Sequence, residues 1–307
     1  MLGILLEFLW TLLQVLWQWV WSVIMTLTPT ALLAKDVSGQ LVLITGAGGG
    51  LGSRMALLFA ELGCRLVLWD VDAKLNARTL AKVEKYGVKV VAHTVDLCDS
   101  KAVAEAAKKV QKEVGNVDIL VNNAGVVYGR SVVDSLDSQV ERTFQVNIEA
   151  HFWTVKAFLP AMIERNSGHV VSIASTAGLF GVPGMADYCS SKFAAVGLSE
   201  SLEMELHKAG KDGVQTTVIC PYLMDTGMFE GCSSRFPLLL SILDPQYVAT
   251  KTVQAVLCNQ NFVILPKILY LMFFLKAILP VKAQILLSDF FGATTIMDTF
   301  VRKEKPA

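Results

Sequence analysis

A tyrosine and a lysine four residues apart, Tyr188 and Lys192, are the side chains of this sequence best suited to moving a proton. The surrounding residues predict a helix from Asp187 to His207, so both side chains project from one helical face. A free tyrosine has a pKa of about 10, and a neighbouring ammonium favours the phenolate. We therefore expect Lys192 to lower the pKa of Tyr188 and to make it a general acid–base near neutral pH.

Taken alone, such a pair usually marks a solvated helix face, but the preceding sequence predicts a nucleotide-binding fold. The apolar run Leu41–Ile44 suits a buried parallel strand, the glycine-rich Thr45–Gly52 follows at once, and a helix is expected over Ser53–Leu62. Glycines let a pyrophosphate approach backbone N–H groups, and a helix N-terminus attracts its charge. We expect four residues of this loop to contact the cofactor: Gly46, Gly50, Leu51 and Gly52.

Asp70 predicts which dinucleotide binds. It ends the second expected strand, Arg65–Trp69, about 20 residues after the glycines, where a carboxylate binds the ribose hydroxyls. A carboxylate there repels a 2′-phosphate, and no Arg or Lys stands beside Asp70 to reverse that preference. We therefore expect NAD rather than NADP.

Strand and helix signals alternate along the rest of the chain, which favours an α/β fold with a Rossmann-type doubly wound parallel sheet. The further expected strands are Val88–Ala92, which leads to Asp96, then Asp118–Val121, Val170–Ile173, Gln215–Cys220 and Phe262–Leu265. The further expected helices are Lys101–Val114, Ser138–Glu164 and Asp187–His207.

From about Gly39 to Leu265 the chain resembles the short-chain dehydrogenase/reductase family. The resemblance lies in Thr45-Gly46-x-x-x-Gly50-x-Gly52, Asn122-Asn123-Ala124-Gly125, Tyr188-x-x-x-Lys192, Ser175 before the tyrosine, and Asn147 at the helix asparagine position. It implies a catalytic set of Asn147, Ser175, Tyr188 and Lys192, and further cofactor contacts from Asp96, Asn123 and Thr226.

The resemblance also implies how these groups act. Tyr188 takes the proton of a substrate hydroxyl, Ser175 hydrogen-bonds the substrate oxygen, and Lys192 also holds the nicotinamide ribose. Asn147 fixes a water that passes the proton outward, unless it is merely a helix-packing amide. One departure is Tyr222, which follows Pro221 where the family has glycine. It puts the backbone path of that loop in doubt, because tyrosine cannot adopt glycine conformations freely.

The N-terminal segment predicts a membrane-anchor helix. Phe8 to Thr28 carries no charged residue and would be about 32 Å long as a helix, enough to cross a hydrocarbon core of about 30 Å. A helix lying in the interface is the alternative, although it would lack the usual charged face. A cleaved signal peptide fits poorly because no basic n-region precedes the apolar stretch.

The C-terminal segment is also apolar. Lys267 to Leu279 forms an expected helix between two prolines and is too short to span a bilayer. We expect it to contact membrane or to close an apolar substrate cleft, with packing on the core as the alternative. The domains expected are an anchor over 1–36, a catalytic domain over 37–265 and an apolar tail over 266–307.

The substrate expectation rests on resemblance to the retinol dehydrogenase branch of the family. That branch implies all-trans-retinol oxidised to retinal at endoplasmic reticulum or lipid-droplet membranes, with a cytosolic catalytic domain and a homodimer formed through the helices of Asn147 and Tyr188. A 17β-hydroxysteroid or fatty-alcohol dehydrogenase and a non-catalytic lipid-droplet scaffold are the alternatives.

The 27 basic and 27 acidic residues balance, which argues against a nucleic-acid partner. The four histidines lack metal-ligand spacing, so we expect no metal and a structural role for His151.

Overall fold

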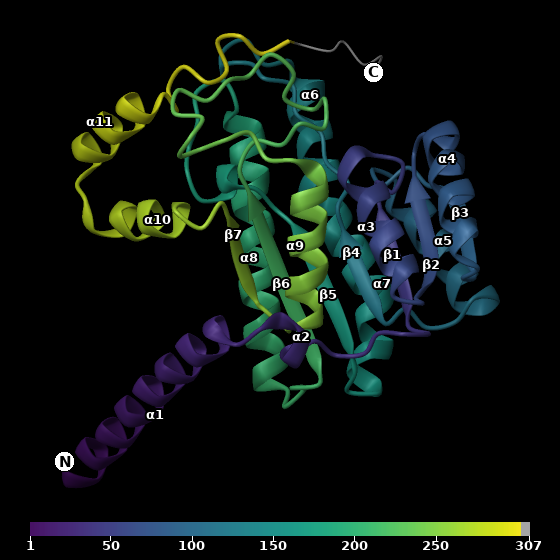
Figure 1. Ribbon diagram of the computed structural model, residues 1–307, viewed down its shortest axis with the longest axis horizontal. Coiled ribbons are helices and arrows are strands. Elements are labelled where there is room, and N and C mark those ends of the chain that lie inside the picture. Colours follow the sequence, from purple (N-terminus) through teal and green to yellow (C-terminus); the bar gives the residue numbers. More distant parts are fainter. Residues whose placement is uncertain (302–307) are drawn as a thin grey trace. The chain divides into compact units, whose positions relative to one another are not determined.

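Short runs of branched apolar residues build a seven-stranded parallel sheet in the order β3-β2-β1-β4-β5-β6-β7 (Figure 1). The computed structural model describes residues 1–301. Its strands are β1 (Leu41–Thr45), β2 (Arg65–Asp70), β3 (Val90–Thr94), β4 (Ile119–Asn122), β5 (Gly168–Ile173), β6 (Val214–Pro221) and β7 (Phe262–Leu265). The predicted doubly wound α/β fold is confirmed.

Helices cover both faces of this sheet because alternate residues of each strand point to opposite sides. Val42 and Ile44 of β1 pack with α3 (Gly50–Glu61) and α9 (Pro245–Leu257). Leu41 and Leu43 of the same strand face a second core, formed with α5 (Ser100–Glu113), α7 (Ala150–Glu164) and α8 (Ala186–Lys208). The strand order reverses between β1 and β4, and ligands of such sheets bind beyond the carboxyl ends of the strands at this switch point.

The expected helix Ser138–Glu164 is interrupted in the structure. It divides into α6 (Asp137–Phe144), a π-helical segment Gln145–Glu149, and α7. Such wide turns insert a local bulge and often mark functional positions. Two other helices of the body, α4 (Ala73–Val83) and α9, were not predicted.

The N-terminal residues form a separate compact unit, Met1–Asp36, with α1 (Leu2–Leu27) and the short α2 (Thr30–Leu33). Within α1, Leu2–Met25 is long and apolar enough to cross a membrane. Its large side chains, Trp10, Trp17 and Trp19 among them, are exposed. The helix is thus a candidate membrane anchor.

Two apolar helices extend the second unit beyond the β7 edge of the sheet (Figure 1). They are α10 (Leu269–Ile278), which was predicted, and α11 (Val281–Phe291), which was not. The hydroxyl of Tyr270 accepts a hydrogen bond from the Ile264 N–H at 3.1 Å and donates one to the Phe262 carbonyl at 3.0 Å. These bonds fasten the start of α10 to the edge strand.

Candidate active site

The glycine-rich turn between β1 and α3 forms one wall of a cleft of about 560 Å³ at the switch point. Gly46 has a φ of +65°, and a Cβ added to it would lie 2.9 Å from the Cα of Ala124. A Cβ on Gly52 would overlap the carbonyl oxygen of Gly46. Glycine is therefore required at both positions, and the bare backbone leaves room for a pyrophosphate next to the N-terminus of α3. The turn fits a dinucleotide.

All the predicted cofactor residues lie together in this cleft. Its lining includes Gly46, Gly50, Leu51, Gly52, Asp70, Asp96, Asn123, Tyr188, Lys192 and Thr226. Asn123 donates from its amide nitrogen to the carbonyl oxygens of Thr45 at 2.8 Å and Gly46 at 3.2 Å, so it holds the glycine turn in place. Thr226 faces the turn from the opposite side, since a Cβ on Gly50 would lie 3.2 Å from its side chain.

Two carboxylates mark the end of the cleft expected to hold the adenosine. Asp70 accepts hydrogen bonds from the Gly48 and Asp72 N–H groups, both at 2.8 Å, and keeps further lone pairs on each oxygen. Asp96 lies 3.3 Å from the Arg142 guanidinium. Burial raises the pKa of Asp96, but the Cys98 N–H and Arg142 outweigh it, and the net pKa is lowered. Both side chains are suited to accept hydrogen bonds from hydroxyl groups of a ligand.

Ser175, Tyr188 and Lys192 meet at the carboxyl edge of β5, where all three are buried. Tyr188 and Lys192 lie one turn apart on α8, with the lysine nitrogen 5.7 Å from the tyrosine ring centroid. The ammonium donates to the carbonyl oxygen of Ile173 at 2.8 Å. The Ser175 hydroxyl hydrogen-bonds the Tyr188 side chain and accepts from the Ala177 N–H at 3.1 Å.

The protonation of Tyr188 differs from our expectation. Burial raises the pKa of Tyr188 well above its ordinary value, and the hydrogen bond from Ser175 offsets only part of that rise. Burial also lowers the pKa of Lys192 to about 8. The prediction that the pKa of Tyr188 is lowered is therefore wrong, because the spacing of Tyr188 and Lys192 fixes their proximity but not the extent of burial.

Asn147 lies in the π-helical segment with its amide fully engaged. Its oxygen accepts from the Val126 N–H at 2.8 Å, and its nitrogen donates to the Val126 carbonyl and the Ser191 hydroxyl, both at 3.0 Å. Its side chain thus joins the loop after β4 to α8. The water-holding role implied by the resemblance remains a prediction.

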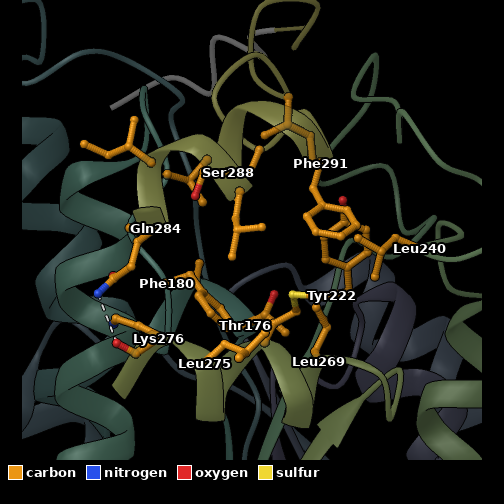
Figure 2. Close-up of a pocket in the computed structure, with 18 of the residues that line it drawn as sticks. Thr176, Phe180, Tyr222, Leu240, Leu269, Leu275, Lys276, Gln284, Ser288 and Phe291 are labelled. Atoms are coloured by element: carbon orange, nitrogen blue, oxygen red, sulfur yellow. Dashed lines mark hydrogen bonds between the residues drawn. The ribbon is translucent and has the colours of Figure 1, made fainter. Parts of the chain in front are cut away.

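A second cavity, of about 300 Å³, begins at Ser175 and is enclosed by α10 and α11. Figure 2 shows Phe180, Leu240 and Phe291 among its mostly apolar walls. Tyr222 also lines it. The backbone of Tyr222 does not need a glycine conformation, since its φ is not positive and its N–H donates to Leu265 at 2.8 Å. The departure from the family motif therefore alters the cavity wall and leaves the strand end regular.

Sequence analysis missed the polar groups that close this cavity. The Lys276 ammonium donates to the carbonyl oxygen of Leu179 at 2.5 Å and lies 4.9 Å from the centroid of the Phe193 ring. Gln284 of α11 donates to the carbonyls of Lys276 at 3.0 Å and Leu279 at 2.8 Å (Figure 2). In the sequence, the one indication of these polar contacts is that Lys276 interrupts an otherwise apolar helix.

His151 is a buried imidazole near this site. Neither ring nitrogen has a hydrogen-bond partner within residues 1–301. Burial lowers the pKa of His151 to about 3, and the positive charge of Lys192 adds to the effect. The imidazole is therefore neutral throughout the physiological pH range.

The fold and the two adjoining cavities define a nicotinamide-dependent alcohol oxidoreductase. Residues 40–235 match the family model described as short chain dehydrogenase. The chain is 48% identical over 272 residues to epidermal retinol dehydrogenase 2 of Homo sapiens, covering 88% of each chain. It is 40% identical over 333 residues to retinol dehydrogenase 10 of Rattus norvegicus, covering 100% of this chain and 97% of that one.

A solved structure agrees with these sequence matches. A short chain dehydrogenase/reductase from Burkholderia phymatum in complex with NAD gives a TM-score of 0.72 at 29% identity, covering 83% of this chain and 96% of that chain. The chain therefore belongs to the short-chain dehydrogenase family, and the predicted resemblance is confirmed.

Because the His151 imidazole is buried and neutral, we expect the free energy of unfolding to fall at acidic pH. The unfolded chain binds a proton at His151 below about pH 6.5, whereas the folded chain does so only near pH 3. Lowering the pH from 7.5 to 5 should thus reduce the free energy of unfolding by about 2 kcal/mol through this residue. Lys192 contributes little over this range and in the same sense, because its pKa of about 8 in the folded protein lies just above pH 7.5.

Urea unfolding of the wild type and His151→Asn at both pH values measures this difference. The variant should lose about 2 kcal/mol less on acidification than the wild type. His207→Asn, an exposed position on α8, is the matched control for removing an imidazole. Equal pH dependence in the wild type and His151→Asn would show that His151 is not held neutral by burial.

Proposed function

We propose that this chain oxidises all-trans-retinol to retinal with NAD, at an endoplasmic reticulum or lipid-droplet surface. The observation that carries the proposal is the apolar cavity that ends at Ser175, next to Tyr188. Its volume of about 300 Å³ lies within the range of small-molecule pockets. The relatives named retinol dehydrogenases, at 40–48% identity, support this choice of alcohol.

The cofactor is held by the cleft residues already described. The glycine turn accommodates the pyrophosphate, while Asp70 binds the adenosine ribose and disfavours a 2′-phosphate. When bound, the nicotinamide supplies the hydride acceptor. Lys192 has ammonium hydrogens beyond the one given to Ile173, and we assign them to the nicotinamide ribose.

The proton chemistry belongs to Ser175 and Tyr188. The Ser175 hydroxyl hydrogen-bonds the substrate oxygen and stabilises the charge that develops there. In its phenolate form, after its own proton has left for solvent, Tyr188 accepts the hydroxyl proton as that oxygen becomes a carbonyl. Because burial raises the pKa of Tyr188, its phenolate is a strong base that forms only transiently in the buried site. The carbonyl product then remains hydrogen-bonded to both hydroxyls.

Lipid contact is proposed for both ends of the chain. Helix α1 serves as the anchor. The α10–α11 hairpin lines the cavity, and its side chains outside that lining include the exposed Phe274, Ile278, Leu286 and Phe290. Exposed apolar surface of this kind marks an interaction site, and Lys267 and Lys282 beside it suit anionic headgroups. We propose that the hairpin is the lid through which a lipid-soluble alcohol enters.

A turnover assay separates the candidate activities. Protein in phospholipid vesicles is given retinol, estradiol or a long-chain alcohol, each with NAD or NADP, and formation of reduced cofactor is measured. Retinol with NAD should give the highest kcat/KM, and Tyr188→Phe should lower kcat by about 10²–10⁴-fold. Tyr247→Phe, on the exposed side of α9, controls for loss of a phenol. No turnover with any alcohol would favour a scaffold, and full turnover in Tyr188→Phe would contradict the mechanism.

Asp70→Asn tests the cofactor assignment. The substitution keeps the side chain's shape but removes the charge, so the ratio of kcat/KM for NAD over NADP should fall at least about tenfold, or 1.4 kcal/mol. Asp72→Asn is the matched control, because Asp72 lines the same cleft and caps α4. Unchanged selectivity in Asp70→Asn would mean that another residue discriminates.

Lys276→Met tests the lid. Hydrogen bonds to charged groups contribute about 1.5–3 kcal/mol, so loss of the bond to Leu179 should raise the KM for retinol roughly tenfold or more. The kcat should change little, because Lys276 does not touch the reacting groups. Lys282→Met, on the exposed face of α11, should leave KM unchanged in detergent solution. An unaltered KM in Lys276→Met would count against a lid that is held closed by the hydrogen bond from Lys276 to Leu179.

A further inference from the structure

The chain returns to the active site after α11, which is capped by Gly292 in the left-handed conformation. Residues 296–301, which we call the C-terminal strap, form turns rather than a helix or a strand. Ile296 lines the apolar cavity, whereas Phe300 and Val301 line the cofactor cleft. One short segment therefore borders both cavities.

Two hydrogen bonds fasten the C-terminal strap to the loop that follows β6. The Val301 N–H donates to the carbonyl oxygen of Glu230 at 2.8 Å. The Thr299 hydroxyl donates to the carbonyl oxygen of Gly231 at 2.6 Å. The strap and this loop are thereby joined next to the cofactor cleft.

Two glycines on different loops allow the strap to approach this closely. Gly231 has a φ of +85°, and a Cβ added to it would overlap the carbonyl oxygen of Thr299. Gly129, in the segment after β4, has a φ of +68°, and a Cβ there would overlap the Phe300 ring. The strap is therefore fitted between two loops of the cleft and does not lie loosely on the surface.

The strap lies at the end of the cleft where Tyr188 is found. Met297 packs against the buried cluster that contains Tyr188, together with Val127 and Phe229. The Tyr188 and Phe229 rings are in edge-to-face contact, with centroids 5.8 Å apart. The Cys232 thiol lies 3.7 Å from the Met297 sulfur, which adds a further contact to the loop after β6.

This end of the cleft is where the nicotinamide has to bind, because its ring exchanges a hydride with an alcohol held beside Tyr188. Phe300 offers an aromatic side chain to that flat ring, and a closed wall here excludes water from the reaction. Asp298 and Thr299 are exposed, and a segment with exposed residues and few hydrogen bonds opens at low cost. The strap thus has the properties of a wall that can move.

We propose that the C-terminal strap covers the nicotinamide end of the bound cofactor, with Phe300 and Val301 as cofactor contacts, and opens when the reduced cofactor is released. The inference rests on the proposed dehydrogenase function. The glycine turn and Asp70 are assigned to the pyrophosphate and the adenosine ribose, so the strap holds the other half of the same molecule.

Phe300→Ala tests the contact through release of NADH, which needs no alcohol. The protein in detergent solution is loaded with NADH and mixed rapidly with excess NAD, and the loss of NADH fluorescence gives the dissociation rate. Because lost contacts act mainly on dissociation, the rate should rise about tenfold in Phe300→Ala. Tyr86→Ala, an exposed aromatic residue outside both cavities, is the control. Equal rates in Phe300→Ala and the wild type would overturn the proposal.

Thr299→Val tests the fastening without changing the shape of the strap. Loss of one hydrogen bond should raise the NADH dissociation rate about twofold to tenfold, and Thr299→Ser should restore the wild-type rate. Thr295→Val is the matched control, because the Thr295 hydroxyl bonds the Gly292 carbonyl within the same turn at 3.4 Å. A wild-type rate in Thr299→Val would contradict a strap held closed by the bond to Gly231.

Hydrogen–deuterium exchange of the wild-type protein provides a readout that needs no variant. NADH should slow the exchange of the amides of residues 296–301, and unchanged exchange there would overturn the strap. If NADH protects the strap but no alcohol is oxidised, the dehydrogenase function fails and the strap stands. A wild-type protein that binds no NADH would refute both proposals.

Discussion

The burial of Lys192 at the carboxyl edge of the sheet is the constraint on which the site depends. An ammonium inside a protein requires compensating hydrogen bonds, and the carbonyl oxygen of Ile173 at the end of β5 provides one at 2.8 Å. This bond fixes α8 against the strand end. Tyr188, one turn earlier on α8, is thereby held next to Ser175, which follows the same strand. A single lysine thus aligns a helix, a strand and the two hydroxyls expected to do the chemistry.

Those hydroxyls lie where two cavities with different linings meet. Tyr188 borders the cleft with the glycine turn and the Asp70 carboxylate, whereas Ser175 borders the apolar cavity under α10 and α11. A charged dinucleotide and an apolar alcohol thus have separate binding surfaces that share one hydrogen-bonded pair. The same burial that raises the pKa of Tyr188 keeps bulk water away from a reacting carbonyl.

The sheet and the cleft could be predicted because their physical signals are local. Buried parallel strands are continuous apolar runs, and β7 was predicted with the bounds that the structure has, while the expected Val88–Ala92 is β3 at Val90–Thr94. Gly46 and Gly52 signal a turn that only glycine can make. The predicted cofactor residues therefore lie together. The domain boundaries at residues 36 and 265 and the catalytic roles remain predictions.

What the sequence did not predict depends on packing between distant segments. Helix α11 was missed because most of its apolar side chains are exposed, so it lacks the one-sided signature of a core helix. The direction of the Tyr188 pKa shift was wrong because burial depends on residues far along the chain. The hydrogen bond from Lys276 to Leu179 joins positions 97 residues apart, so no local sequence motif can predict it.

The measurement that tests the account most directly follows the hydride itself. All-trans-retinol with both hydrogens of its carbinol carbon replaced by deuterium is incubated with NAD and the full chain in phospholipid vesicles, and the reduced cofactor is analysed by NMR. Deuterium should appear on one face of the nicotinamide ring, in equal amount to the retinal formed, because the two cavities allow one relative orientation. Reduced cofactor without deuterium, or retinal formed without reduced cofactor, would contradict direct transfer between the two bound molecules.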